Sequence, residues 1–560
     1  MRLIKTHFFY PFCLPPGSFE RLRAKNPEHK KADAMFQPTE QIRQSDPRTY
    51  AEYVYFHPHA RDLLFGPIKE QRSVLAYEVP NEKIRGWKFR VKLPPRNDVD
   101  QAIEKILGLA DVHVMFYDLG VAVLSFSVYW DYRIAEGVGL SGDFSFDDLL
   151  DLNNLVRRRA PSFIDTSTFP VNGPTPNNVP AGSWAGIQKA QRELAEAISI
   201  ESPDKVQAME DFGDSFDEVF SSASKTPYVG NHFQFWLDRI AVDLGLDVSE
   251  STPILDERGF VHSFVLADRG DTAIDGGASE LPDFASSPEN VFGKLTDEPE
   301  LFRSALLRLL AVDPAGKDYV ANPGLRDSFL SNWLYLRYRD ESTYMGFTRC
   351  SGVFLLHADG PRSTPPIGAA DPEGFTRSVL LKHFDSMYFQ MACLLLVYRA
   401  GLLDLSHRCT MIAQRVSSPE DLDKRSVGDD IERLRSDFLR FHTKYWSCEI
   451  TAQEQGIEMF SLWNRNMDNE HLFSEVDQQI RALHEFSLAT VNRRLGRLTY
   501  LNLSVLGVAL LSVAGTTLTI THSTWWSAVA RLGSAALLLG IIISLVLLWR
   551  GSWVIKKLIG

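Results

Sequence analysis

Residues 501–520 read LNLSVLGVALLSVAGTTLTI and residues 532–549 read LGSAALLLGIIISLVLLW, and neither run contains a charged residue. Each run is long enough to cross the roughly 30 Å hydrocarbon core of a bilayer as a helix. The short loop between them contains Trp525 and Trp526, an aromatic pair suited to the headgroup level. The pattern predicts a C-terminal two-helix transmembrane hairpin, with a basic tail, over residues 501–560.

Basic residues flank the two predicted spans on their outer sides. They are Arg493, Arg494 and Arg497 before the first span, and Arg550, Lys556 and Lys557 after the second. Because positive charge gathers on the cytoplasmic side, both termini are predicted to be cytoplasmic. The N-terminal residues contain no apolar stretch of signal-peptide length. The chain is therefore expected to be a multi-pass protein of the cell (inner) membrane, with the lipid bilayer as a partner.

The composition of the remaining chain is that of a folded, acidic protein. The 560 residues carry a net charge of −12, and no basic stripe is dense enough to follow a run of phosphates, so nucleic acid is excluded as a partner. The five cysteines are scattered and include no Cys-x-x-Cys pair, which argues against a disulfide framework and a structural zinc site.

The part of the chain before the hairpin divides by pattern into three regions. Residues 1–165 are predicted to form an N-terminal α/β domain, residues 166–370 a mixed α/β region with long loops, and residues 371–500 a long helical stalk. A Pro- and Asn-rich stretch at 161–186 indicates a lid or a linker. Helical periodicity dominates from Phe375 onward.

Alternation and turn signals predict the local elements of the first two regions. The predicted strands are Trp87–Leu93, a hairpin of Val112–Tyr117 and Val121–Trp130, Phe260–Leu266, Tyr344–Arg349 and Val353–His357. The predicted helices are Asp98–Leu109, Ile187–Ile200, His232–Leu244, and one ending at Val156 that Ser145 and Asp148 open as a capping box.

Two apolar patterns predict the stalk. Steps of three and four from Ile431 through Tyr445 and on to Leu462 indicate one long helix packed against neighbours. A further pattern from Leu472 to Leu498 contains no proline, so this helix is expected to run directly into the first span. The apolar stretch Tyr388–Leu405 is interrupted by Arg399 and is expected to be a buried helix of the soluble part.

This layout of an α/β cytoplasmic domain, long α-helices and a C-terminal two-helix transmembrane hairpin resembles the CorA-type metal ion transporter superfamily. The resemblance covers roughly Phe375–Gly560. It implies a homo-oligomer, such as a pentamer, whose first transmembrane helices line an ion path, with Mg²⁺ or another divalent cation as the transported or gating ion. The family ends its first span with a Gly-Met-Asn triplet, whereas Gly515–His522 reads GTTLTITH, so the chain resembles a divergent, CorA-like protein that lacks this motif.

Small and hydroxylated residues recur on one face of the first predicted span. They are the candidate pore-lining residues Asn502, Ala509, Ser512, Thr516 and Thr519. The alternative is that they serve close packing between transmembrane helices. The three arginines Arg493, Arg494 and Arg497 either form a basic ring at the inner mouth or contact lipid headgroups.

Polar groups elsewhere give no defined metal site and no catalytic motif. Carboxylates that could bind a divalent metal, or simply be solvated, are Asp429, Asp430, Glu432, Glu449, Glu454 and Glu458. His57 and His59, with Asp62 nearby, are expected in a surface loop. No phosphate loop, nucleophile elbow or His-Glu-x-x-His motif is present, so an enzyme is not predicted and no cofactor is assigned.

The leading functional expectation is an oligomeric cation channel or transporter gated by its cytoplasmic domain. The alternative is a membrane-anchored sensor or effector whose soluble α/β domain binds a ligand or partner, with no selective transport.

Overall fold

The computed structural model of the chain describes residues 1–24, 34–39, 53–65, 72–93, 103–159, 197–211, 229–246, 248, 252–253, 258–268, 299–315, 322–358, 374–415 and 425–519. These fall into two compact units. The sheet unit comprises Met1–His407 and Asp437–Val476, and the helical unit comprises Arg408–Ser436 and the chain from Asp477 onward. The predicted lid or linker, the second span with its preceding loop, and the basic tail lie outside the described residues.

A mixed β-sheet is the centre of the sheet unit. Its main path runs β11-β12-β13-β10-β1-β6-β5-β4-β7-β8, with β3 also pairing β5, β2 pairing β3, and β9 pairing β1. The pairs are antiparallel except for the parallel pair β10 and β13. The strands are β1 Leu3–Cys13, β2 Gln37–Pro38, β3 Val74–Glu78, β4 Lys88–Leu93, β5 Ile103–Tyr117, β6 Val121–Asp131, β7 Ala197–Glu201, β8 Val206–Asp211, β9 Thr252–Pro253, β10 Phe260–Ala267, β11 Leu334–Tyr335, β12 Thr343–Phe347 and β13 Ser351–His357. Strands from residues 1–165 and from residues 166–370 thus share one sheet.

Side-chain alternation along β1 assigns the two faces of this sheet. Ile4 and Phe8 belong to the core beneath one face. His7 and Phe9 point to the other face, where both rings lie against Phe389, with centroids 5.1 and 5.3 Å away. Both faces are therefore covered, and the sheet unit has three layers.

Three helices cover the first face: α6 Phe146–Val156, α9 Asn231–Leu244 and α10 Glu300–Ala311. Tyr10 stacks on Phe233 of α9 with centroids 5.2 Å apart, and Asn153 of α6 donates to the Ser263 hydroxyl at 3.1 Å. The predicted capping box closes the start of α6, because Ser145 and Asp148 each accept from the other's backbone N–H.

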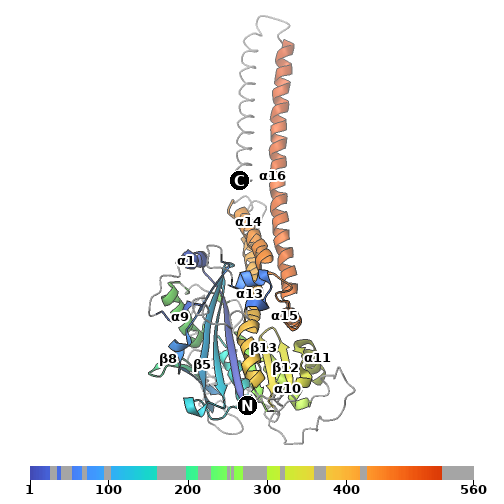
Figure 1. The fold of residues 1–560 in the computed structure, drawn as a ribbon. Coiled ribbons are helices and arrows are strands. Elements are labelled where there is room, and N and C mark those ends of the chain that lie inside the picture. Colours follow the sequence, from blue (N-terminus) through green and yellow to red (C-terminus); the bar gives the residue numbers. More distant parts are fainter. Residues whose placement is uncertain are drawn as a thin grey trace, which may run out of the picture. The chain divides into compact units, whose positions relative to one another are not determined.

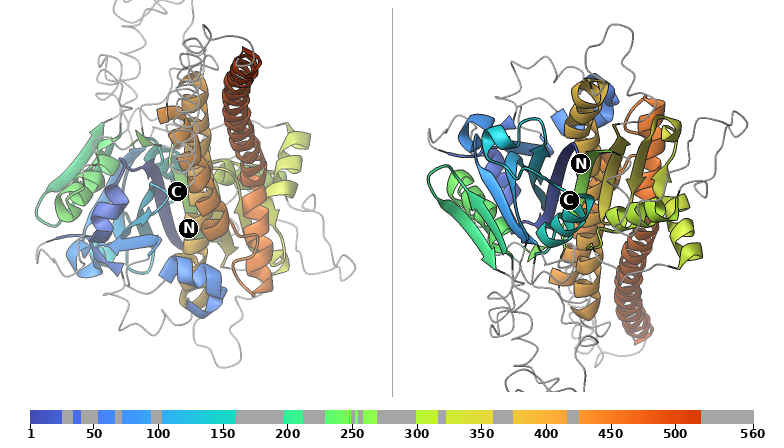
Figure 2. Two further views of the ribbon diagram at one scale, coloured as in Figure 1. Left: turned by 90° about the horizontal axis from the view of Figure 1, so that it is seen from above. Right: turned by 90° about the horizontal axis from the view of Figure 1, so that it is seen from below.

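The second face is covered by one composite helix and by α15 Glu454–Asn466. The composite helix runs through η8 Thr376–Leu380, α12 Leu381–His383, η9 Phe384–Tyr388 and α13 Phe389–Arg415. The views in Figure 2 show α13 lying across the sheet. Trp463 of α15 stacks on Phe347 of β12 with centroids 4.6 Å apart.

Further short helices complete the sheet unit: α1 Ser18–Ala24, α4 Pro58–Phe65, α5 Asn81–Ile84, η1 Glu136–Val138, α11 Pro323–Trp333, η6 Arg339–Glu341 and η11 Phe441–Tyr445. The five cysteines are free thiols.

Several local predictions are confirmed. The hairpin of β5 and β6, the capping box, strand β10, the strand pair β12 and β13, and helix α9 lie where their patterns indicate. Two predicted helices are wrong over the residues that the structure describes. Residues 103–109 of the predicted helix Asp98–Leu109 belong to β5, which pairs with β4 there, and residues 197–200 of the predicted helix Ile187–Ile200 belong to β7. Both segments are strands because they pair with β4. The spacing of apolar residues in a short segment fits the period of a helix or that of a strand.

The predicted single helix from Ile431 to Leu462 is also wrong. Helix α14 Arg425–Arg440 continues through η11 to Tyr445, and the chain leaves helical geometry until Glu454. In that gap Thr451 pairs with Phe56, and its hydroxyl donates to the Tyr55 carbonyl at 2.5 Å. A tertiary pairing therefore breaks a pattern that is locally helical.

Helix α16, Asn469–Thr519, is one unbroken helix of 51 residues (Figure 1). The predicted continuity from Leu472 past Leu501 is confirmed. Its first residue is anchored in the sheet unit, where Asn469 is fully buried and donates to the Leu395 carbonyl at 3.3 Å.

Among the described residues, one helix is long and apolar enough to span a membrane, the composite helix Thr376–Arg415. Its most apolar window is 83% buried within the protein, which is typical of a core helix and agrees with the prediction for Tyr388–Leu405. In α16 the apolar stretch found is the shorter Leu498–Leu511.

Candidate functional site

The predicted pore-lining residues Asn502, Ala509, Ser512, Thr516 and Thr519 all lie in α16. Asn502 and Ala509 are half-buried. The side chains of the other three, and those of the predicted inner-mouth arginines Arg493, Arg494 and Arg497, lie outside the described part of the chain. The helix thus brings these positions into one element without testing their role.

Two of the three predicted carboxylates of the helical unit lie beside a basic side chain. Asp430 accepts from Arg415 at 2.6 Å, and Glu432 lies 3.4 Å from the His484 ring. Asp429 is exposed. Pairs of this kind are typical of a solvated helix surface.

The other predicted carboxylates are separated by the break after η11. Glu449 lies in the non-helical segment, whereas Glu454 and Glu458 lie on α15 and both accept from Arg337, at 3.1 and 2.9 Å. Glu454 and Glu458 therefore both pair with Arg337.

The segment His57–His59 contacts the same non-helical segment. His57 lies 3.0 Å from the Glu449 carboxylate, and His59 lies 3.0 Å from the Ser447 hydroxyl. Pro58 begins α4, so His59 lies in a helix rather than in the expected surface loop, and Asp62 lies within α4.

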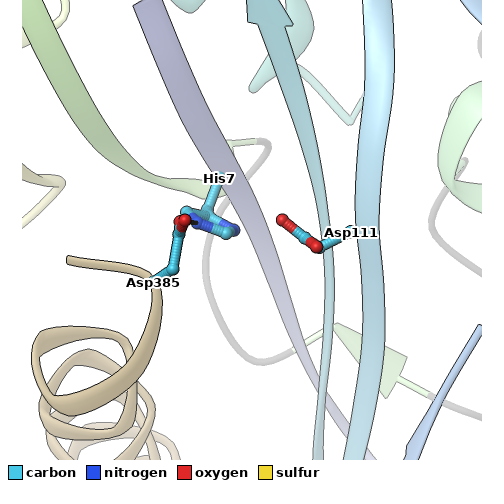
Figure 3. Close-up of side chains that lie close together, drawn as sticks. All are labelled: His7, Asp111 and Asp385. Carbon is cyan, nitrogen blue, oxygen red and sulfur yellow. Dashed lines mark hydrogen bonds and ion pairs between the residues drawn. The ribbon is translucent and has the colours of Figure 1, made fainter. Parts of the chain in front are cut away.

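A polar cluster that sequence reasoning missed lies between the second face of the sheet and the composite helix. Within the described residues, His7, Asp111 and Asp385 are the one group of three whose candidate metal-ligand atoms lie within 4.8 Å of one another. His7 comes from β1, Asp111 from β5 and Asp385 from η9. Figure 3 shows the His7 ring between the two carboxyl groups.

Lys5 is the fourth member of this cluster. Its Nζ lies 2.6 Å from Asp111 and 2.7 Å from Asp385, and His7 Nε2 lies 3.1 Å from the other oxygen of Asp385. The Ser127 hydroxyl donates to Asp111 at 3.1 Å, which fixes that carboxylate on the sheet. The cluster therefore ties η9 to β1 through Asp385.

Burial and charge act in opposite directions on the pKa values of this cluster. Burial lowers the pKa of the Lys5 ammonium, but the charges of Asp111 and Asp385 raise it more, so its pKa is raised. Burial raises the pKa of Asp111, but Lys5 and the nearby imidazoles lower it more, so its pKa is depressed. Both groups are therefore charged at neutral pH.

Aromatic rings close the inner side of the cluster. His7 lies 5.4 Å from the Phe384 ring, and His262 stacks on the same ring at 4.1 Å. Burial, and then the neighbouring His7, lower the pKa of His262 well below 6.5, so this ring is neutral. The cluster thus has an apolar wall on one side and partly exposed carboxylates on the other.

This arrangement can hold a cation, because two carboxylates and an imidazole converge on one position that an ammonium group now contacts. The residues that would hold a metal ion are His7, Asp111 and Asp385. The sequence contained one signal of the cluster, namely that Lys5 and His7 interrupt the apolar strand LIKTHFFYPF on the same face.

No protein-family model, no curated protein and no solved structure matches the chain. Its function therefore has to be inferred from its own residues.

Proposed function

We propose that the chain is a membrane protein of CorA-like organisation that passes cations as a homo-oligomer. In this proposal α16 leaves the sheet unit and enters the bilayer as the first span of the two-helix hairpin. The observation that carries it is the unbroken course of α16, whose 51 residues correspond to a rod of about 75 Å. A rod of that length can join a folded domain to the far side of a bilayer.

A single stripe of residues, here called a seam, runs along the C-terminal part of this helix. Its positions alternate by three and four residues, and they are Leu488, Val491, Leu495, Leu498, Asn502, Val505, Ala509, Ser512, Thr516 and Thr519. The first four of these residues, from Leu488 to Leu498, are exposed although each is Leu or Val. We define these ten positions as the α16 seam.

Spacing of this kind is the seam along which helices associate, because it keeps one stripe facing a partner. Identical helices in parallel match such a stripe residue by residue. Copies of this chain, in a pentamer as the family resemblance implies, would cover the exposed leucines at the lower end of the seam.

The chemistry of the α16 seam changes along its length. The last leucine of the seam is Leu498, and from Asn502 onward small and hydroxylated residues predominate. In an oligomer held together by Leu488 through Leu498, the seam residues from Asn502 to Thr519 would surround the symmetry axis. They would present hydroxyl groups to hydrated cations. Neither predicted span contains an acidic residue or lysine, so passage would follow the ion gradient.

The basic residues flanking the two spans support an inner-membrane location with both termini in the cytoplasm. In that orientation the sheet unit would face the cytoplasm and gate the path. The absence of a Gly-Met-Asn triplet leaves the choice among Mg²⁺ and other divalent cations to experiment. Enzymatic activity is not part of the proposal.

Ion flux into liposomes containing the purified full chain tests this function. We expect divalent flux in wild type, tested with Mg²⁺, Zn²⁺ and Ni²⁺ against monovalent ions, and its loss to background in Thr516→Trp, because an indole would fill the axis at that depth. The matched control is Leu510→Trp, an exposed position outside the seam, which should conduct as wild type does.

Equal loss in both variants would contradict a path along the seam. Absence of flux for every ion in wild type would favour a second function, a membrane-anchored sensor or effector whose soluble domain binds a ligand or partner. The observation that favours this second function is the missing triplet at Gly515–His522.

A further inference from the structure

We propose that His7, Asp111 and Asp385 form a binding site for a first-row divalent cation such as Zn²⁺, and that the Lys5 ammonium holds the place of that cation. The site lies within the sheet unit. It goes beyond the proposed ion path, and it stands whether or not the chain conducts ions.

The ligand atoms are near the spacing that a small cation requires. They lie within 4.8 Å of one another. Tetrahedral zinc with bonds of about 2.0–2.1 Å places its ligands roughly 3.4 Å apart. Closing the cluster therefore needs side-chain rotations and no movement of a strand.

His7 supplies a second, independent reason to expect a ligand. Its side chain is only 1% exposed and is aimed at Asp385 through Nε2. Its Nδ1 is also buried and has no hydrogen-bond partner among the described residues. A buried nitrogen left unsatisfied carries a free-energy cost, and a cation bound to His7 through Nδ1 would remove that cost while Nε2 keeps its contact with Asp385.

The two carboxylates around Lys5 favour a cation of higher charge than an ammonium group. Lys5 offers one positive charge to the two carboxylates, whereas a divalent ion would offer two. The Lys5 side chain is long and 13% exposed, and the carboxylates are 25% and 30% exposed, so the ammonium can swing out and an ion can enter from solvent.

The ligand set selects the class of metal. Imidazole nitrogen with carboxylate oxygen suits zinc, manganese or cobalt, whereas magnesium prefers oxygen alone and retains several waters. Ser127, which donates to Asp111, would orient that ligand as partners of metal-bound carboxylates commonly do. A bound ion would fasten η9 to β1 and β5 more tightly than Lys5 does.

Zinc affinity of the EDTA-treated full chain in detergent tests the site, measured by competition with a chromogenic chelator and by the absorption spectrum of bound Co²⁺. We expect Lys5→Met to bind at least about tenfold more tightly than wild type, because it loses the competing ammonium. Asp385→Asn and His7→Gln should lose the binding. His57→Gln is the matched control, since that histidine lies beside Glu449 outside the cluster.

Binding confined to Lys5→Met would still support the site, with Lys5 as the stronger competitor. The proposal is overturned if neither wild type nor Lys5→Met binds Zn²⁺, or if Asp385→Asn and His7→Gln bind as wild type does. If Lys5→Met does not fold, a wild type that binds no Zn²⁺ overturns the proposal, and a wild type that binds is tested by the loss of binding in Asp385→Asn and His7→Gln.

Discussion

Lys5→Met, studied in the presence of EDTA, is expected to lower the free energy of unfolding of the sheet unit by about 3–5 kcal/mol. Lys5 is the cation between Asp111 and Asp385, at 2.6 and 2.7 Å. Methionine keeps the length of the side chain but leaves two partly buried carboxylates without their counter-charge. Thermal and urea unfolding of the full chain, followed by tryptophan fluorescence, measures this loss.

Two further variants separate the charge effect from the loss of a lysine. Lys92→Met removes an exposed lysine of β4 and should change stability by less than about 0.5 kcal/mol. Adding Asp111→Asn to Lys5→Met should recover part of the loss, because it removes one unpaired carboxylate. Equal stability of Lys5→Met and Lys92→Met would show that the cluster does not hold η9 on the sheet.

Trp463→Ala is expected to cost about 3–5 kcal/mol, because it removes a buried indole that packs α15 against the sheet. The indole is 1% exposed and stacks on Phe347 at 4.6 Å, with Phe260 and His262 at 5.8 and 5.4 Å. These rings come from β12 and β10, so one side chain ties α15 to two strands. Differential scanning calorimetry of the full chain measures the loss.

Trp463→Phe is the matched variant, because phenylalanine keeps an aromatic ring and most of the apolar volume. It should lose less than half as much as Trp463→Ala. A Trp463→Ala protein that melts with wild type would mean that α15 is not held through this residue.

Local signals in the sequence predicted local structure well. The capping box at Ser145 and Asp148 needs only three residues of spacing, and the hairpin of β5 and β6 needs only the turn at Asp118–Gly120. The secondary structure of segments that is decided by pairing with a distant strand was predicted wrongly. Ile103, Ile106 and Leu107 have a spacing that fits a helix, but the segment is a strand because β4 pairs with it.

The candidate sites show the same division. That Asn502 through Thr519 share one helix could be predicted, because one period runs through these positions, and their pore-lining role stays a prediction. The cluster of His7, Asp111 and Asp385 could not, because its members lie 104 and 274 residues apart along the chain, and no local spacing links them. Only the sheet register, with β6 between β1 and β5, and the helix crossing it bring them together.

We propose that α16 enters the bilayer on the C-terminal side of Leu498. Spin labels placed one at a time along residues 481–519 of the full chain in liposomes test it, through collision rates with oxygen, which concentrates in lipid, and with a water-soluble nickel complex. We expect the labels to be accessible to the nickel complex up to about residue 492, and their accessibility to oxygen to rise from Leu501 onward. Nickel accessibility along the whole helix, with no oxygen maximum, would contradict it.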